Sequence, residues 1–288
     1  MRELRRDPHL GTRVHVDGSR LNRPQRPATD CPFCVGGLEA PDPYEVRWFP
    51  NRWPALGEGN NEVVLFSPDH DASLATLGVD GVRRVIDLWA ERTVALGARP
   101  DIEFVLVFEN RGAEVGATIA HPHGQIYAFD HVPDRPARLL AARWEPDRSP
   151  GERLVVAHRG WSAWVPWAPV YPVEVHIAPA TRVAQIDELD DEGRTALATM
   201  LVDVLGRLER LFDQPLPYML WLEQAPTGGD SAGVGWFHIR IVSPWRRAGL
   251  QRIMGAAEVA TEEYIIEVVP EDLAGRLRAV GDAERGEP

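Results

Sequence analysis

One stretch decides how the sequence is interpreted: Asn110-Arg111-Gly112-Ala113-Glu114-Val115-Gly116-Ala117-Thr118-Ile119-Ala120-His121-Pro122-His123-Gly124-Gln125. An apolar run at 104–108 precedes it and a second at 126–129 follows it, so a glycine-rich loop lies between two predicted strands. Glycines let a backbone approach a ligand closely, and successive loop N–H groups bind phosphate. The two histidines at its end offer a metal ligand and a nucleophile. A polar strand end with incidental histidines is the alternative interpretation.

This stretch closely resembles the active-site loop of galactose-1-phosphate uridylyltransferases, a family of the histidine-triad (HIT) superfamily. The family pattern stands as Phe108-Glu109-Asn110-Arg111-Gly112, Gly116-Ala117-Thr118 and His121-Pro122-His123-Gly124-Gln125. The resemblance covers about residues 12–280. It implies nucleotidylyl transfer, with UMP as the transferred group, through a covalent intermediate on His123. Gln125 would then donate to a phosphoryl oxygen of the transferred group.

Composition limits the class of protein. The chain has 288 residues, 44% of them hydrophobic, and a formal net charge of −12, which argues against a broad nucleic-acid-binding surface. No apolar run reaches membrane-spanning length, and residues 1–10 lack the apolar core of a signal peptide. Two cysteines in so long a chain do not make a disulfide framework. We therefore expect a cytoplasmic protein with neither nucleic acid nor membrane as a partner.

The order of predicted elements repeats along the chain. A strand, a helix (79–96), a strand, a loop and a strand with His123 are followed by a strand, a helix (190–212), a strand, a loop and a strand with His238. This order predicts an internal duplication, with chance agreement as the alternative. The alternation favours an α/β or α+β fold with mainly antiparallel sheets covered by helices. The resemblance narrows this to an α+β fold of two fused HIT-like halves, 1–150 and 151–288, that form an open half-barrel.

Cys31 and Cys34 form a C-x₂-C pair, which places two thiolates at a spacing that binds one tetrahedral metal ion. A redox pair is the alternative, although no thioredoxin-like βαβ context surrounds it. The resemblance supplies the remaining ligands as His70 and His121. Four protein ligands leave no open coordination position, so this resemblance implies one structural zinc ion per chain.

Several further residues match nucleotide-site positions of the family. Arg20 and Arg23 have the spacing of its Arg-x-x-Arg-Pro motif, and guanidinium groups suit phosphate, although solvated loop arginines are the alternative. Where the family continues Asn51 with an acid that contacts ribose, this chain has Arg52. The resemblance therefore implies nucleotide or phosphate contacts for Arg20, Arg23, Asn51, Asn110, Gly116, Thr118 and Gln125.

The second half departs from the family pattern. A family histidine pair in the last strand is reduced to His238, because Arg240 stands at the other position, and the region near Leu139 lacks an acidic ligand. We therefore expect the second metal site of the family to be absent. Tyr264 stands where the family has a sugar-contacting glutamine, which predicts that galactose 1-phosphate is a poor acceptor or at least not the best one. Neighbouring residues that supply the lost hydrogen bonds are the alternative.

Three functions remain open at this point. The first is a nucleotidylyltransferase that uses a nucleotide sugar and a sugar 1-phosphate, acting as the homodimer that the family implies. The second is a related hydrolase or phosphorylase of a nucleotide sugar or dinucleoside polyphosphate. The third is a non-catalytic nucleotide-binding module, against which the intact segment 121–125 argues. Only the second acceptor separates the first two.

Overall fold

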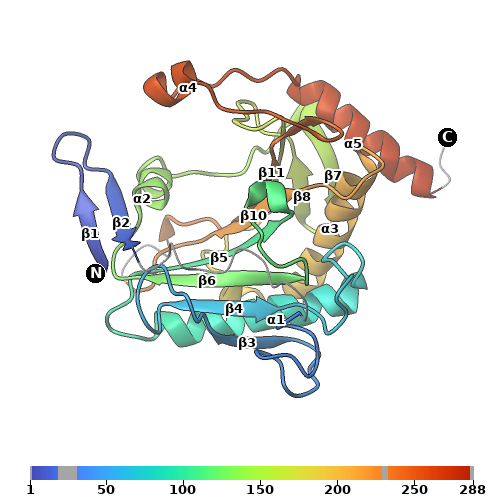
Figure 1. The fold of residues 1–288 in the computed structure, drawn as a ribbon. Helices are drawn as coiled ribbons and strands as arrows, with labels where there is room; N and C mark the ends of the chain where they lie inside the picture. The colour runs from blue at the N-terminus through green and yellow to red at the C-terminus, as the bar shows by residue number, and fades with distance from the viewer. Residues whose placement is uncertain (1, 19–30, 229–232, 286–288) are drawn as a thin grey trace.

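The computed structural model describes residues 2–18, 31–228 and 233–285 (Figure 1). Its strands are β1 Arg2–Arg6, β2 Arg13–Asp17, β3 Arg47–Pro50, β4 Asn61–Leu65, β5 Phe104–Arg111, β6 His123–Phe129, β7 Leu154–His158, β8 Trp161–Trp164, β9 Val173–Pro179, β10 Tyr218–Glu223, β11 His238–Ser243, β12 Trp245–Arg247 and β13 Leu250–Gln251. Its α-helices are α1 Gly78–Gly97, α2 Asp134–Ala141, α3 Asp191–Arg210, α4 Ala256–Thr261 and α5 Pro270–Arg285.

One large sheet organises the molecule. Nine strands pair in the order β3-β4-β6-β5-β10-β11-β9-β8-β7, and every neighbouring pair is antiparallel. Within the described residues, β3 and β7 are the two edges and do not pair with each other, so the sheet does not close into a barrel. The predicted α+β class with an open, mainly antiparallel sheet is confirmed.

The strand order contains the same arrangement twice. The run β4-α1-β5-β6 places its strands as β4-β6-β5, and the run β9-α3-β10-β11 places its strands as β9-β11-β10. The two runs meet where β5 pairs with β10 at the centre of the sheet. This arrangement supports a duplicated architecture, while the boundary near residue 150 stays a prediction.

The two faces of the sheet differ in burial. In β5, Val105 and Val107 are buried in the main core with Val85 and Trp89 of α1, whereas Phe108 on the opposite face is only half-buried. Helices α1 and α3 pack against each other and share this core, so both cover the same face (Figure 1). The face without these helices is here called the open face.

The predicted elements are confirmed at the core and differ at the edges. The helices expected at 79–96 and 190–212 are α1 and α3, and the apolar runs at 104–108 and 126–129 lie in β5 and β6. Strand β6 begins at His123, earlier than the apolar run at 126–129, because its pairing with β4 extends to that residue. The charged strand β1 was not predicted, since it pairs only with β2 in a hairpin outside the main sheet. None of the described helices is long and apolar enough to cross a membrane.

Candidate functional site

A metal-type cluster lies beside the amino end of β6. Its members are Cys31, Cys34, His70 and His121, and one ligand atom from each lies within 4.8 Å of all the others. The Cys34 Sγ atom is 3.5 Å from His70 Nδ1 and 3.6 Å from His121 Nδ1. The structure thus brings together all four predicted ligands from three separated segments, in a set that could hold one metal ion.

The hydrogen bonds of His121 fix which ring nitrogen faces the cysteines. Its Nε2–H donates to the backbone oxygen of Ser67 at 2.8 Å, and the hydroxyl of Tyr44 lies 2.9 Å from the same nitrogen. The lone pair is therefore on Nδ1, the atom beside Cys34. Burial lowers the pKa of His121, which is fully enclosed, so the neutral ring that a metal requires is favoured.

His123 is held in a complementary way. Its Nδ1–H donates to the carbonyl oxygen of His121 at 2.8 Å, which places the lone pair of the neutral ring on Nε2. The ring packs edge-on against Phe33, with ring centroids 5.2 Å apart. A fixed tautomer with a lone pair on Nε2 is what a nucleophilic histidine needs.

Gln125 lies on the same face of β6 as His123, because side chains two residues apart in a strand point the same way. Asn51, just after β3, donates from Nδ2 to Gln125 Oε1 at 3.1 Å, and its own oxygen accepts from the backbone N–H of Trp53 at 2.8 Å. Since Oε1 is occupied as an acceptor, the amide nitrogen of Gln125 is the group left to donate to a ligand.

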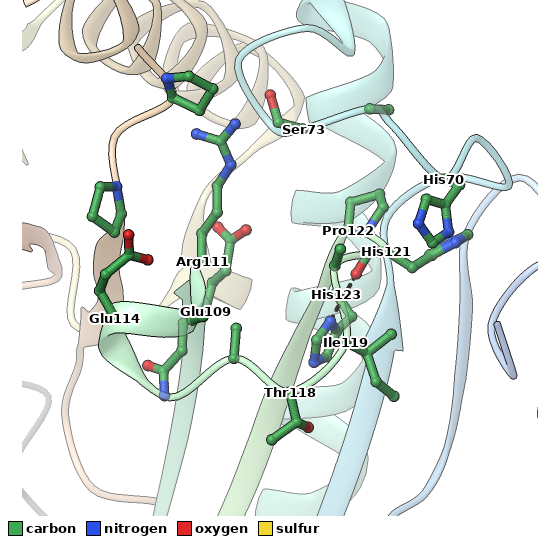
Figure 2. A pocket seen from close by; sticks show the side chains of 18 of the residues that line it. His70, Ser73, Glu109, Arg111, Glu114, Thr118, Ile119, His121, Pro122 and His123 are labelled. Atoms are coloured by element: carbon green, nitrogen blue, oxygen red, sulfur yellow. Dashed lines mark hydrogen bonds between the residues drawn. The ribbon is translucent and has the colours of Figure 1, made fainter. Parts of the chain in front are cut away.

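A cavity of about 630 Å³ lies beyond the ends of β5 and β6. Figure 2 shows Arg111 and Glu109 on one side of it and His70, Pro122 and His121 on the other. The loop between the strands closes a further side; it turns at Gly116, whose φ of 89° is the left-handed conformation that glycine adopts without strain. The predicted residues Asn110, Thr118 and His123 all line this cavity.

Two predicted residues cannot be placed, and the residue that follows Asn51 lies in an ion pair. Arg20 and Arg23 lie outside the described residues. Arg52, which stands where the family has an acid, forms an ion pair with Glu39 at 2.9 Å. This pair directs the guanidinium of Arg52 to a carboxylate of the same half.

The residues of the second half are spread over the open face and a peripheral segment. The buried ring of His238 stacks on Trp144 at a centroid distance of 3.6 Å, and Arg240 forms an ion pair with Glu174. Tyr264 lies in the half-exposed segment after α4, and no residue of 252–265 lines the cavity beside His123.

Sequence reasoning missed a buried pair next to this site. The hydroxyl of Tyr218 donates to Glu109 Oε2 at 2.8 Å across the seam between β5 and β10, and both side chains are buried. Burial raises the pKa of Glu109 to about 7, and the hydrogen bond from Tyr218 and the guanidinium of Arg111 offset only part of this effect. The signal available in the sequence was the acidic residue Glu109, which continues the alternation of buried side chains along β5.

The chain matches known proteins along most of its length. It matches the family "Galactose-1-phosphate uridyl transferase, N-terminal domain" over residues 53–133 and the corresponding C-terminal domain over residues 119–286. The galactose-1-phosphate uridylyltransferase of Thermotoga maritima is 33% identical over 96% of this chain and 98% of that protein. The chain belongs to the galactose-1-phosphate uridylyl transferase family. It is thus a member of an enzyme family of transferases.

Two further comparisons agree with this assignment. The galactose-1-phosphate uridylyltransferase of Streptomyces lividans is 35% identical over 99% of this chain and 89% of that protein. A solved structure titled "Structure of uridylyltransferase" superposes with a TM-score of 0.88, at 28% identity, over 98% of this chain and 99% of that one. The family likeness therefore extends over the N-terminal segment and both halves of the sheet.

The buried carboxyl of Glu109 predicts a pH dependence of stability. Its pKa rises from about 4.5 in the unfolded chain to about 7 in the folded protein, so the folded protein holds this proton more tightly. The free energy of unfolding should therefore fall as pH rises from about 5 to 8, and Glu109→Gln should remove roughly 3 kcal/mol of this fall. Urea unfolding at pH 5 and pH 8 measures the effect. The exposed control Glu103→Gln should keep the wild-type dependence, and parallel curves for Glu109→Gln and wild type would contradict the prediction.

Proposed function

We propose that this enzyme transfers UMP between a nucleotide sugar and a sugar 1-phosphate through a covalent intermediate on His123. The observation that carries the proposal is the hydrogen bond from His123 Nδ1–H to the carbonyl of His121. It leaves Nε2 with the lone pair, on the same face as the amide nitrogen of Gln125. The relatives from Thermotoga maritima and Streptomyces lividans are uridylyltransferases by name, which supports UMP as the transferred group.

The chemistry follows from these two side chains. Nε2 of His123 attacks the α-phosphorus of the nucleotide sugar, and the bond from that phosphorus to the bridging oxygen breaks, so the sugar 1-phosphate leaves with the electron pair. The ring then carries a positive charge, which the carbonyl of His121 stabilises by accepting from Nδ1–H. Gln125 donates to a non-bridging oxygen without adding charge. In the second step, a phosphate oxygen of the incoming sugar 1-phosphate displaces His123.

The phosphates and the nucleoside need further donors around His123. The proposal assigns them to Asn110 and Thr118 in the cavity wall, to Gly116 in the loop beside it, to Asn51 next to Gln125, and to the two arginines outside the described residues. Backbone N–H groups of the loop that turns at Gly116 suit phosphate oxygens, and guanidinium groups suit them bidentately. The assigned residues are Arg20, Arg23, Asn51, Asn110, Gly116 and Thr118.

The metal of the proposal is one structural zinc ion per chain. Two thiolates and two neutral imidazole nitrogens are ligands that zinc prefers, and four of them close its tetrahedral shell. The cysteines are free thiols, as the site requires, and such thiols persist in a reducing compartment such as the cytoplasm. The residues of this chain would hold the ion between the segment 31–34 and His121. The ion would therefore stabilise the shape of the site and take no part in the reaction.

A homodimer is part of the same proposal. The segment 252–265 exposes Ile253, Met254, Val259 and Ile265, and it keeps a defined shape because Glu258 accepts from the backbone N–H groups of Gly255 and Ile265. Within its own chain this segment does not line the cavity beside His123. An apolar, preformed segment of this kind suits the active site of a second copy. Sedimentation of the protein as a monomer at micromolar concentration would contradict it.

A phosphorylase or hydrolase is the second candidate. It shares the first step at His123 and differs only in the group that releases the nucleotide, which would be inorganic phosphate or water. The observation that supports this candidate is the changed acceptor side of the site, where Tyr264 is half-exposed and Arg240 forms an ion pair with Glu174.

For the metal, we expect protein purified without chelator to carry one zinc ion per chain. His70→Gln should reduce the zinc content below stoichiometry and lower the melting temperature, because the ion cross-links distant segments. His158→Gln at the exposed end of β7 is the matched control and should keep its zinc. Elemental analysis that finds no zinc in the wild-type protein would contradict the assignment.

For the nucleophile, a nucleotide sugar labelled in its α-phosphate should leave acid-labile, base-stable label on the protein. His123→Ala should form none, whereas Gln125→Ala should form it about 10²-fold more slowly because one donor to the developing charge is lost. His158→Ala should label like wild type. Turnover without label in a rapid-quench experiment, or inversion at phosphorus, would exclude the two-step mechanism.

For the acceptor, we expect galactose 1-phosphate not to give the highest kcat/KM. A tyrosine in place of glutamine removes an amide that both donates and accepts, and adds an aromatic face. A panel of sugar 1-phosphates, inorganic phosphate and water, assayed for exchange and hydrolysis, measures this preference and separates the two candidate functions. Tyr264→Gln should shift the preference toward galactose 1-phosphate by at least about tenfold. If wild type already prefers galactose 1-phosphate, the prediction is wrong.

A further inference from the structure

A buried carboxylate lies on the open face of the second half of the sheet. Glu174 of β9 is fully enclosed, with 0% of its surface exposed. Its Oε1 atom accepts from His176 Nε2 at 3.1 Å and forms an ion pair with Arg240, and its Oε2 atom accepts from the backbone N–H of Val170 at 2.9 Å. Both oxygens of this carboxylate are therefore engaged by groups of the protein.

Strand register explains why these side chains meet. Arg240 of β11 lies directly opposite His176 of β9 and, on its other side, opposite Trp221 of β10. His238 precedes Arg240 by two residues, so it points to the same face, and the ring centroids of His176 and His238 are 6.0 Å apart. The patch thus contains three side chains of metal-ligand type, from Glu174, His176 and His238.

The patch nevertheless does not fit the second metal ion that the family resemblance implies. In the part of the chain that the structure describes, Cys31, Cys34, His70 and His121 are the one group whose ligand atoms converge on a single point. The other carboxylate nearby, Glu223, accepts from Trp221 Nε1 at 2.7 Å and from Arg135 Nε at 3.3 Å. Both oxygens of Glu174 are thus engaged by groups of the protein, and the Oε1 atom of Glu223 is engaged as well.

The surroundings of His238 also exclude a hydrated ion. Its Nδ1–H donates to the carbonyl of Trp236 at 2.9 Å, and Trp144 covers the ring. Burial lowers the pKa of His238 to about 3, so the ring stays neutral. The cavity beside it has a volume of about 20 Å³, room for about one water molecule, and its walls include Leu139 and Leu140.

We infer that the guanidinium of Arg240 takes the place of a metal ion in the patch formed by Glu174, His176 and His238. It neutralises Glu174, links β11 to β9, and keeps a metal ion out of this patch. The guanidinium also lies against the ring of Trp221, with Cζ 5.3 Å from the ring centroid. A planar, permanently charged group suits a carboxylate and an aromatic ring at once. The second half therefore obtains from its own side chain the positive charge that a metal ion would bring.

The first test is stability. Arg240→Met leaves Glu174 charged and without its cation, and truncating one partner of a buried pair is strongly destabilising. We expect the melting temperature to fall by on the order of 10 °C for a chain of this size. Arg246→Met removes an ion pair whose two side chains are 42% and 46% exposed, and serves as the matched control with a shift of at most about 2 °C. Glu174→Gln in the Arg240→Met background should recover part of the loss.

The second test is metal content and does not depend on the first variant being stable. Arg240→His places an imidazole beside His176 and His238 and frees Glu174, so this variant should carry one more zinc ion per chain than wild type after incubation with zinc and desalting. The comparison uses a difference between two proteins, so it does not depend on the cysteine site or on catalysis.

Three results would overturn the inference. One is an Arg240→Met protein that melts within about 2 °C of wild type. Another is a wild-type protein whose second zinc ion is lost in Glu174→Gln, since the patch would then bind metal despite Arg240. The last is an Arg240→His protein with the same zinc content as wild type, because the patch would then lack metal for a reason other than the guanidinium.

Discussion

The segment 121–123 connects the metal-type cluster to the proposed nucleophile through three backbone and side-chain contacts. The side chain of His121 faces Cys34, and its carbonyl oxygen accepts from His123 Nδ1–H. Pro122 has no N–H to satisfy, and its carbonyl accepts from the backbone N–H of Phe66 at 3.1 Å. A displacement of His121 would therefore move the acceptor that sets the tautomer of His123. The cluster is therefore coupled to His123 through geometry, by way of the backbone of residues 121–123.

The residues that follow His123 in β6 are also held by a few specific contacts. A side chain at Gly124 would meet the carbonyl oxygen of Phe108 at 2.8 Å and the ring of Phe66 at 2.8 Å, so this position between His123 and Gln125 must lack a Cβ atom. Close packing on the helix-covered face fixes β6, and the side chains on either side of the glycine then project to the open face. The contact with Asn51 completes the arrangement by orienting the amide of Gln125.

How much the sequence could reveal depended on the kind of signal. Helices α1 and α3 follow from apolar spacing, because each buries one stripe against the sheet. The candidate metal ligands His70 and His121 came from the family resemblance, because no spacing rule connects them to a cysteine pair so distant in the chain. Contacts such as that between Glu109 and Tyr218 are set by strand register across the centre of the sheet, which local patterns do not specify.

The two halves of the sheet share one strand order and differ in their chemistry. Both halves place a histidine-bearing strand next to its partner strand in the same spatial order, and both His123 and His238 donate from Nδ1 to a carbonyl two residues earlier. His123 lines an open cavity, whereas His238 is enclosed under Trp144. The same local hydrogen bond thus sets the tautomer of the histidine in both strands. Whether a ligand can reach Nε2 of that histidine then distinguishes the two halves. Since β5 and β10 join the halves through buried side chains, the second half supports the first as a scaffold even where its own histidine is closed off.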